Sequence, residues 1–322
     1  MSFLLRFAGL RLFGFLLGVT LLAWFIAHTD IGQLLGVFQR IGWAFLAIMA
    51  ARGATIFSDC GAWRCLLPPE GRPSFWAMLP LRWIGEAINT TLPAAQIGGE
   101  VVRGRLLQQR VTAPARGAAS VVVDFCLSLL AQMICTLSGF ILLIRLSAAT
   151  SWWPAALCAL AVPAFAIFSW ELLVRRRLLT AVERLAERLG QRRLPAMLRN
   201  LAGALGLLAI DRRALGLSLA LHFLSWAGHI GELWLTLTLM GSPIGIAEAA
   251  MLESLSLGAR SAAFLIPSGW GAQEAALMAL AALTGVAPQT ALALGLVKRA
   301  REFAIGLPGL LTWAMIEQRP VR

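Results

Sequence analysis

The chain contains apolar stretches of about 20 residues or more, and this feature most limits what it can fold into. An α-helix of that length crosses the ~30 Å hydrocarbon core of a bilayer. The composition agrees, because 59% of the 322 residues are hydrophobic and only 14% are charged, against about 25% charged in soluble proteins. Soluble enzymes, disordered chains and disulfide-rich secreted domains are therefore excluded. The sequence predicts an all-α polytopic membrane protein.

Six windows bounded by charged or turn-forming residues have the length of a full membrane span. These windows are residues 7–27, 41–67, 117–145, 152–174, 214–240 and 290–316. Most arginines lie outside them, in clusters at both termini and within 103–116 and 175–213. Cytoplasmic loops are enriched in Lys and Arg, so these clusters can all lie on one side. We therefore expect a multi-pass protein of a bacterial inner (cytoplasmic) membrane with both termini in the cytoplasm. Because the net charge of +12 is explained in this way, no nucleic acid partner is expected.

Two further apolar stretches, 73–102 and 248–285, are interrupted by proline and glycine. For the arginine pattern to hold, each must begin and end on the same side of the membrane. A re-entrant pair of half-helices meets both conditions, because irregular backbone at membrane depth is tolerated only where it is buried in protein or lines a cavity. We predict two re-entrant hairpins, the first entering from the cytoplasm and the second from the outside.

The two interrupted stretches carry a similar motif. The first reads PAAQIGGE over residues 93–100, and the second reads PSGWGAQE over residues 267–274. An ionisable residue precedes each proline by seven positions, Glu86 in the first and Arg260 in the second. Span, hairpin and span thus occur twice in opposite directions, which is typical of transporters with inverted repeats and a midplane site. The alternative is that the strings agree by chance and both stretches are ordinary tilted helices.

These elements divide the chain into four segments. Residues 1–40 are expected to form an N-terminal anchor span, which has no small-residue cleavage site and should be retained. Residues 41–145 form the first repeat, 146–213 a connecting span and basic cytoplasmic loop, and 214–322 the second, inverted repeat. The loop 175–213 has leucines and charges at helical spacing. It predicts either a basic amphipathic helix on the inner leaflet or a solvated connector.

The residues around both motifs resemble a known family. The strings WIGEAIN at 83–89, LPAAQIGGEVV at 92–102 and IPSGWGAQE at 266–274 are similar to the transmembrane region of lysylphosphatidylglycerol synthases, a group of flippase-like integral membrane proteins. The first motif most resembles the hopanoid-biosynthesis-associated branch. The resemblance covers nearly the whole chain and implies a protein that moves or handles a polar lipid. Since it concerns the membrane region alone, it implies no lysyl transfer. Many members carry Glu-Arg before the aspartate of the span that follows, where this chain has two valines, so only Asp124 is carried over.

Ionisable side chains at membrane depth are the candidate substrate-binding residues. Such a side chain costs at least about 2.5–3.5 kcal/mol at a helix centre, so it is usually partnered or functional. The candidates, with the glycines and prolines beside them, are Arg82, Glu86, Asn89, Pro93, Gln96, Gly98, Gly99, Glu100, Arg103, Asp124, Arg260, Pro267, Gly269, Gly271, Gln273, Glu274, Lys298 and Arg299. One interpretation is a midplane cavity for a lipid headgroup, in which half-helix N-termini offer free N–H groups to an anion. The other is that Glu86 and Glu100 pair with arginines of the second repeat only to hold the repeats together.

Two further groups of polar residues lie within predicted spans. Arg52 and Asp59 are seven residues apart on one helical face, which favours a structural ion pair. His222 and His229 are also seven apart, with Glu232 one turn beyond. This spacing favours hydrogen-bonded histidines over a proton relay, and the further acid or histidine at i+4 that a metal site would need, as in HExxH, is missing. We expect no metal, no cofactor and no catalytic residue, because no nucleotide-binding or nucleophile motif is found.

The sequence favours a lipid transporter or flippase whose partners are membrane lipids, with lipid-biosynthesis or export proteins as further candidates. The rival is an enzyme or subunit of hopanoid or glycolipid biosynthesis. Such an enzyme needs a water-side cluster of acids or a donor-binding loop, and the loop 175–213 holds few acids among many arginines. The lipid itself stays open, since the family branch favours a hopanoid whereas the arginines suit a phosphate-bearing headgroup. The oligomeric state stays open too.

Overall fold

The computed structural model describes residues 41–91, 98–147, 211–263 and 271–317, together with 202–206 and a few isolated positions. Within these ranges every regular element is a helix, which confirms the all-α prediction. The predicted spans 7–27 and 152–174 and most of the loop 175–213 lie outside the described residues.

Four long helices correspond to four predicted spans. They are α3 (Phe45–Cys65), preceded by the 3-10 turn η1 (Gly42–Ala44), α6 (Pro114–Ser147), α10 (Arg212–Leu239) and α13 (Pro288–Glu317). By length and composition, α6 and α10 are apolar enough to cross a bilayer. Helices α3 and α13 also have the required length of about 20 residues or more, but both carry several of the charged side chains described below.

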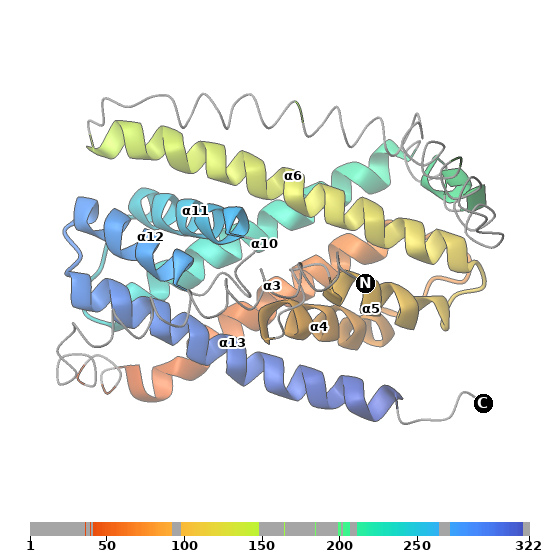
Figure 1. Cartoon of the computed structure of the whole chain (residues 1–322), viewed down its shortest axis with the longest axis horizontal. Coiled ribbons are helices and arrows are strands. Elements are labelled where there is room, and N and C mark those ends of the chain that lie inside the picture. The colour runs from red at the N-terminus through yellow and green to blue at the C-terminus, as the bar shows by residue number, and fades with distance from the viewer. Residues whose placement is uncertain are drawn as a thin grey trace, which may run out of the picture.

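Two pairs of short helices lie in the two interrupted stretches. Helix α4 (Phe75–Thr91) packs against α5 (Gly98–Gln108), and α11 (Ile246–Ala262) packs against α12 (Ala272–Ala281), which continues into the 3-10 turn η4 (Ala282–Thr284). Each pair doubles back on itself, and the two pairs lie toward opposite ends of the long helices (Figure 1). Helix α5 runs on to Gln108, beyond the predicted hairpin end at residue 102.

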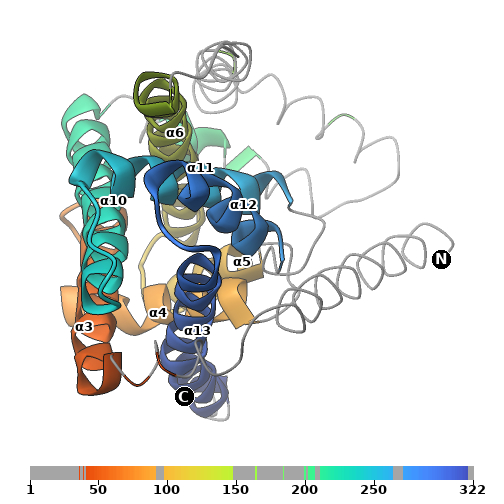
Figure 2. The ribbon, with the colours of Figure 1, turned by 90° about the vertical axis from the view of Figure 1, so that its left-hand side faces the viewer.

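The packing partners repeat between the two halves of the chain. Helices α3 and α10 pack against each other, α4 packs against α13, and its counterpart α11 packs against α6. In the same way α5 contacts α6, and α12 contacts α13. Figures 1 and 2 show α6 and α13 at opposite edges, running in opposite directions, with the short pairs between them. This exchange of partners is what a two-fold relation between α3–α6 and α10–α13 requires.

Glycines let the exchanged partners approach closely. At the contact of α4 with α13, a Cβ atom on Gly309 would lie 2.7 Å from Ala87 Cβ. At the contact of α6 with α11, a Cβ atom on Gly139 would lie 2.9 Å from Ser254 Cβ. Lipid tails remove the hydrophobic drive for association between membrane helices, so small residues that allow close packing hold such interfaces together.

Candidate functional site

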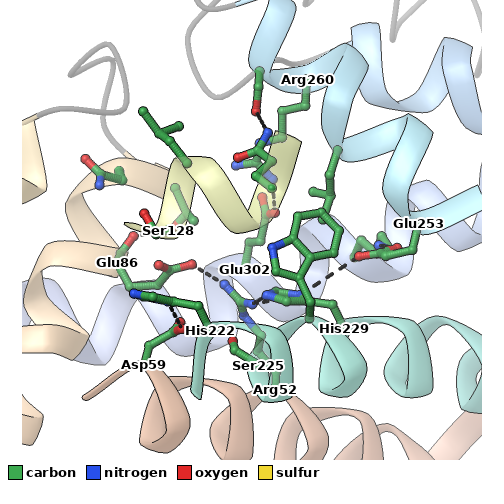
Figure 3. A pocket seen from close by; sticks show the side chains of 18 of the residues that line it. Arg52, Asp59, Glu86, Ser128, His222, Ser225, His229, Glu253, Arg260 and Glu302 are labelled. Carbon is green, nitrogen blue, oxygen red and sulfur yellow. Dashed lines mark hydrogen bonds and ion pairs between the residues drawn. The ribbon is translucent and has the colours of Figure 1, made fainter. Parts of the chain in front are cut away.

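A cavity of about 400 Å³ lies where the helices of both halves meet. All eight helices α3–α6 and α10–α13 contribute to its lining. Five basic and five acidic side chains face it: Arg52, Arg82, Arg260, Lys298, Arg301, Asp59, Glu86, Glu100, Glu253 and Glu302. Figure 3 shows several of these side chains pointing toward one another from different helices. Charges buried at this depth must be compensated, and most of them form ion pairs.

In the first half, the ion pairs converge on Asp124, whose side chain on α6 is 0% exposed. Arg82 on α4 reaches Asp124 Oδ2 with Nη1 at 3.2 Å and Asp59 Oδ2 with Nη2 at 3.1 Å. Arg103 on α5 places Nη1 2.7 Å from the same Asp124 oxygen and also pairs with Glu100. These contacts tie α3, α4, α5 and α6 together around one carboxylate.

His222 connects this cluster to the second half. It lies on α10, with Nδ1 3.3 Å from Asp59 Oδ1 and Nε2 3.1 Å from Asp124 Oδ1. The imidazole therefore bridges carboxylates of α3 and α6. The interpretation of His222 as a hydrogen-bonded histidine within the bundle is confirmed.

In the second half, the ion pairs centre on Arg299 and Glu302 of α13. Arg299 places Nε 2.6 Å from Glu274 Oε1 and Nη1 2.8 Å from Glu302 Oε2. Arg260 on α11 pairs with Glu302, and its Nη1 donates to Gln273 Oε1 at 3.3 Å. The hairpin helices α11 and α12 are thereby bound to α13.

Three more ion pairs involve residues that line the cavity. Lys298 pairs with Glu253, and Arg301 pairs with Glu232 on α10. Arg52 on α3 pairs with Glu86 on α4 and lies 2.9 Å, from Nη1 to Nε2, from His229 on α10.

Comparison with known families agrees with the sequence motifs. A family model described as the lysylphosphatidylglycerol synthase TM region matches residues 11–309. The chain belongs to this family. It is therefore a polytopic membrane protein of a family with a lipid-related function. No curated protein and no solved structure matches the chain significantly. The closer affinity to the hopanoid-associated branch stays a prediction.

The predicted site residues that the structure describes fall into three groups. Those that line the cavity are Arg82, Glu86, Asn89, Glu100, Arg260, Gln273 and Lys298. Those that lie behind the lining and bind it through ion pairs are Arg103, Asp124, Glu274 and Arg299. Gly98 and Gly99 begin α5, and Gly271 caps α12 with φ +79°. Pro93, Gln96, Pro267 and Gly269 lie outside the described residues.

The pairing favoured for Arg52 and Asp59 is wrong, and so is the alternative interpretation in which Glu86 and Glu100 pair with arginines of the second repeat. Arg52 and Asp59 share a helical face, but Arg52 pairs with Glu86 whereas Asp59 pairs with Arg82. Likewise Glu86 and Glu100 find arginines of the first half, not of the second. Spacing along one helix places side chains on a face, but the partner is decided by which neighbouring helix that face meets.

Two of the N–H groups near the N-termini of α5 and α12, which were expected to be free, have side-chain partners. The Gly99 N–H donates to Asn89 Oδ1 at 2.8 Å, and the Gly271 N–H donates to Glu274 Oε2 at 2.8 Å. At each terminus a side-chain oxygen accepts the hydrogen bond that an anion was expected to accept. These two amides are therefore not available to a ligand of the cavity.

Several lining residues were not among the predicted ones. Glu253, Arg301 and Glu302 face the cavity, and each is a charge inside a predicted span or hairpin, which is the signal that could have identified them. Ser128 and Gln132 follow Asp124 at intervals of four residues along α6. Residues four apart lie on one helical face, so this polar stripe on an apolar span also indicates a lined cavity. Among the described residues, no cluster of His, Cys, Asp and Glu has the arrangement of a metal site.

Proposed function

We propose that this protein is a lipid transporter or flippase that binds the polar headgroup of a membrane lipid in the central cavity. The observation that carries the proposal is the cavity itself, which both halves line with ten charged side chains. Buried ion pairs are weak evidence for stability, because desolvation offsets their attraction. Ionisable groups within a membrane usually mark a substrate or ion pathway. Together with the family's lipid-related function, this favours a headgroup site.

The helix arrangement supports movement of the bound lipid between leaflets. In the proposal, α4–α5 and α11–α12 are re-entrant hairpins that enter an inner membrane from opposite sides, within the repeats 41–145 and 214–322. The exchanged packing of α4 on α13 and α11 on α6 supports this relation. Rocking of one repeat against the other then opens the cavity to alternate sides. Contacts between the repeats, such as those of His222 with Asp59 and Asp124, would break and form again in each cycle.

The charges of the lining also indicate which class of headgroup the cavity would bind. Five basic and five acidic side chains balance each other, so a bound group that is polar but carries no net charge disturbs the ion pairs least. The hydroxyls of a hopanoid polyol and a zwitterionic phospholipid headgroup both meet this condition. A headgroup with a net negative charge is accommodated only where its phosphate replaces one of the carboxylates.

Two serines of α6 allow a matched test of the proposal. Ser128 lines the cavity and Ser138 is exposed, and each hydroxyl donates to the carbonyl three residues earlier, at 2.9 and 2.7 Å. Ser128→Phe therefore fills the cavity without removing an ion pair, whereas Ser138→Phe adds the same side chain outside it. We expect Ser128→Phe alone to lose co-purifying lipid and translocation of fluorescent lipids in reconstituted vesicles.

The lipids should be identified first, by mass spectrometry of those that co-purify with the wild type and both variants. Translocation of the enriched class is then measured as the fraction of fluorescent lipid that dithionite cannot quench. If Ser128→Phe binds and translocates lipid as well as Ser138→Phe, the cavity is not the headgroup site. Product formation by the wild type with lipid and an activated donor would instead support a biosynthetic enzyme.

A further inference from the structure

A second cavity of about 390 Å³ lies between α5 and α6 and adjoins the central one. Its walls are apolar along most of their length, and polar side chains lie at its margins. The apolar lining residues are Val101, Gly104, Ala118, Val121, Val122 and Phe125. Glu100 and Phe125 line this groove and the central cavity alike, so these two side chains form the border between the two spaces.

We propose that the groove between α5 and α6 binds the hydrocarbon tail of the lipid whose headgroup occupies the central cavity. This proposal rests on the proposed function and adds to it the path of the tail. The lipid enters and leaves the protein sideways, between these two helices, with its polar end toward the ion pairs.

The dimensions and exposure of the groove fit such a tail. From Glu100 to Gln108, α5 rises ~12 Å at 1.5 Å per residue, so the groove extends over about two helical turns. Val101 on its wall is 67% exposed, which opens the groove outward. An exposed apolar groove of this kind is costly in water but suits contact with lipid chains.

The change from polar to apolar lining occurs at Glu100. Its carboxylate pairs with Arg103 and accepts a hydrogen bond from Asn89 Nδ2 at 3.4 Å. One helical turn further along α5, Gly104 already belongs to the apolar wall. A lipid that crosses this boundary places the linkage between headgroup and tail beside Glu100.

At Gly104 the packing of α5 against α6 is looser than the packing at the glycines of two other interfaces. A Cβ atom on Gly104 would lie 3.7 Å from Val121 Cγ2, which is an ordinary van der Waals contact. At the contacts of α6 with α11 and of α4 with α13, the corresponding distances from Gly139 and Gly309 are 2.9 and 2.7 Å. Those interfaces are closed by small residues, so a tail passes more easily between α5 and α6.

The test fills the groove and follows the tail directly. Gly104→Phe places a ring in the groove, whereas Gly216→Phe places the same ring on the exposed face of α10, where nothing lies within 4 Å of an added Cβ atom. Each protein is reconstituted in vesicles of phosphatidylethanolamine and phosphatidylglycerol with a trace of phosphatidylethanolamine that carries a photoreactive diazirine in its acyl chain. After illumination, cross-linked peptides are mapped by mass spectrometry.

We expect cross-links of the wild type and Gly216→Phe to concentrate on residues 101–125, and to fall about tenfold there in Gly104→Phe. Displacement of two methylene groups from an apolar site corresponds to roughly that factor. Cross-links spread evenly over the apolar faces of α6, α10 and α13, and unchanged in Gly104→Phe, would overturn the proposal. Ala118→Phe fills the groove from the α6 wall and serves as a second variant if Gly104→Phe does not fold.

Translocation measured in the same vesicles separates this proposal from the one on which it rests. Loss of translocation in Ser128→Phe but not in Gly104→Phe would leave the headgroup cavity standing and refute the tail groove. Full translocation in both variants would refute the proposed function itself. Loss in both, with cross-links displaced in Gly104→Phe, is the expected result.

Discussion

Removal of the charge of Asp124 is the most direct test of the buried network. Asp124→Asn keeps the shape of the side chain, but Arg82 loses one of its two carboxylate partners and Arg103 keeps only Glu100. The side chains of Asp124 and Arg103 are 0% and 1% exposed, so water cannot replace the lost partner. Loss of one member of a buried pair costs about 3–5 kcal/mol, and we expect the free energy of unfolding to fall by that amount.

The free energy is measured by denaturant unfolding of the detergent-solubilised protein, followed by tryptophan fluorescence. Trp63 reports on the network, because the Arg103 guanidinium carbon lies 4.7 Å from its ring centroid. The control is Glu317→Gln, which removes the pair of Glu317 with Arg105, whose side chains are 35% and 59% exposed. An exposed pair contributes about 0–1 kcal/mol. If the free energy of unfolding falls by the same small amount in both variants, the ion pairs of Asp124 are not shielded from water as their burial indicates.

Further substitutions test other contacts of the structure. Gly99→Ala brings a Cβ atom into the Gly85 carbonyl and should lower the free energy of unfolding by about 1–3 kcal/mol. Gly53→Ala, with nothing within 4 Å, should leave stability unchanged or raise it by about 0.4–1 kcal/mol. Lys298→Met should be strongly destabilising because Glu253 stays buried without its partner, and Glu253→Gln in the same chain should recover part of that loss, as a double-mutant cycle would show. Trp83→Phe removes the hydrogen bond to the Ile305 carbonyl and should cost about 1 kcal/mol in thermal unfolding; an unchanged melting curve would contradict that contact between α4 and α13.

Most of the helices could be predicted because a long apolar segment inside a membrane must satisfy its backbone hydrogen bonds internally, as an α-helix does. The predicted span 290–316 corresponds to α13 (Pro288–Glu317), and the predicted span 41–67 contains α3 (Phe45–Cys65). The interrupted stretches correspond to two pairs of short helices, α4 with α5 and α11 with α12, although Pro80 and Pro308 lie inside helices.

The partners of the charges were less predictable than their positions. Arg52 and Asp59 lie on one face of α3, but that face meets α4 and α10, which supply Glu86, Arg82 and the two histidines. Helix rotation and crossing decide such contacts, and the spacing of residues along one helix does not contain them. The polar stripe of α6 shows what the spacing does contain, because intervals of four residues identify which face is lined.

The ion pairs that join each pair of short helices to the span that follows it have opposite polarity. In the first half the arginine lies on the hairpin helix α5 and the carboxylate on α6, as Arg103 and Asp124. In the second half the carboxylate lies on the hairpin helix α12 and the arginine on α13, as Glu274 and Arg299. The two motifs align Glu100 with Glu274, but Glu100 pairs with Arg103 of its own helix whereas Glu274 pairs with Arg299 of the next span. The two related halves therefore neutralise the same buried motif position with partners from different helices.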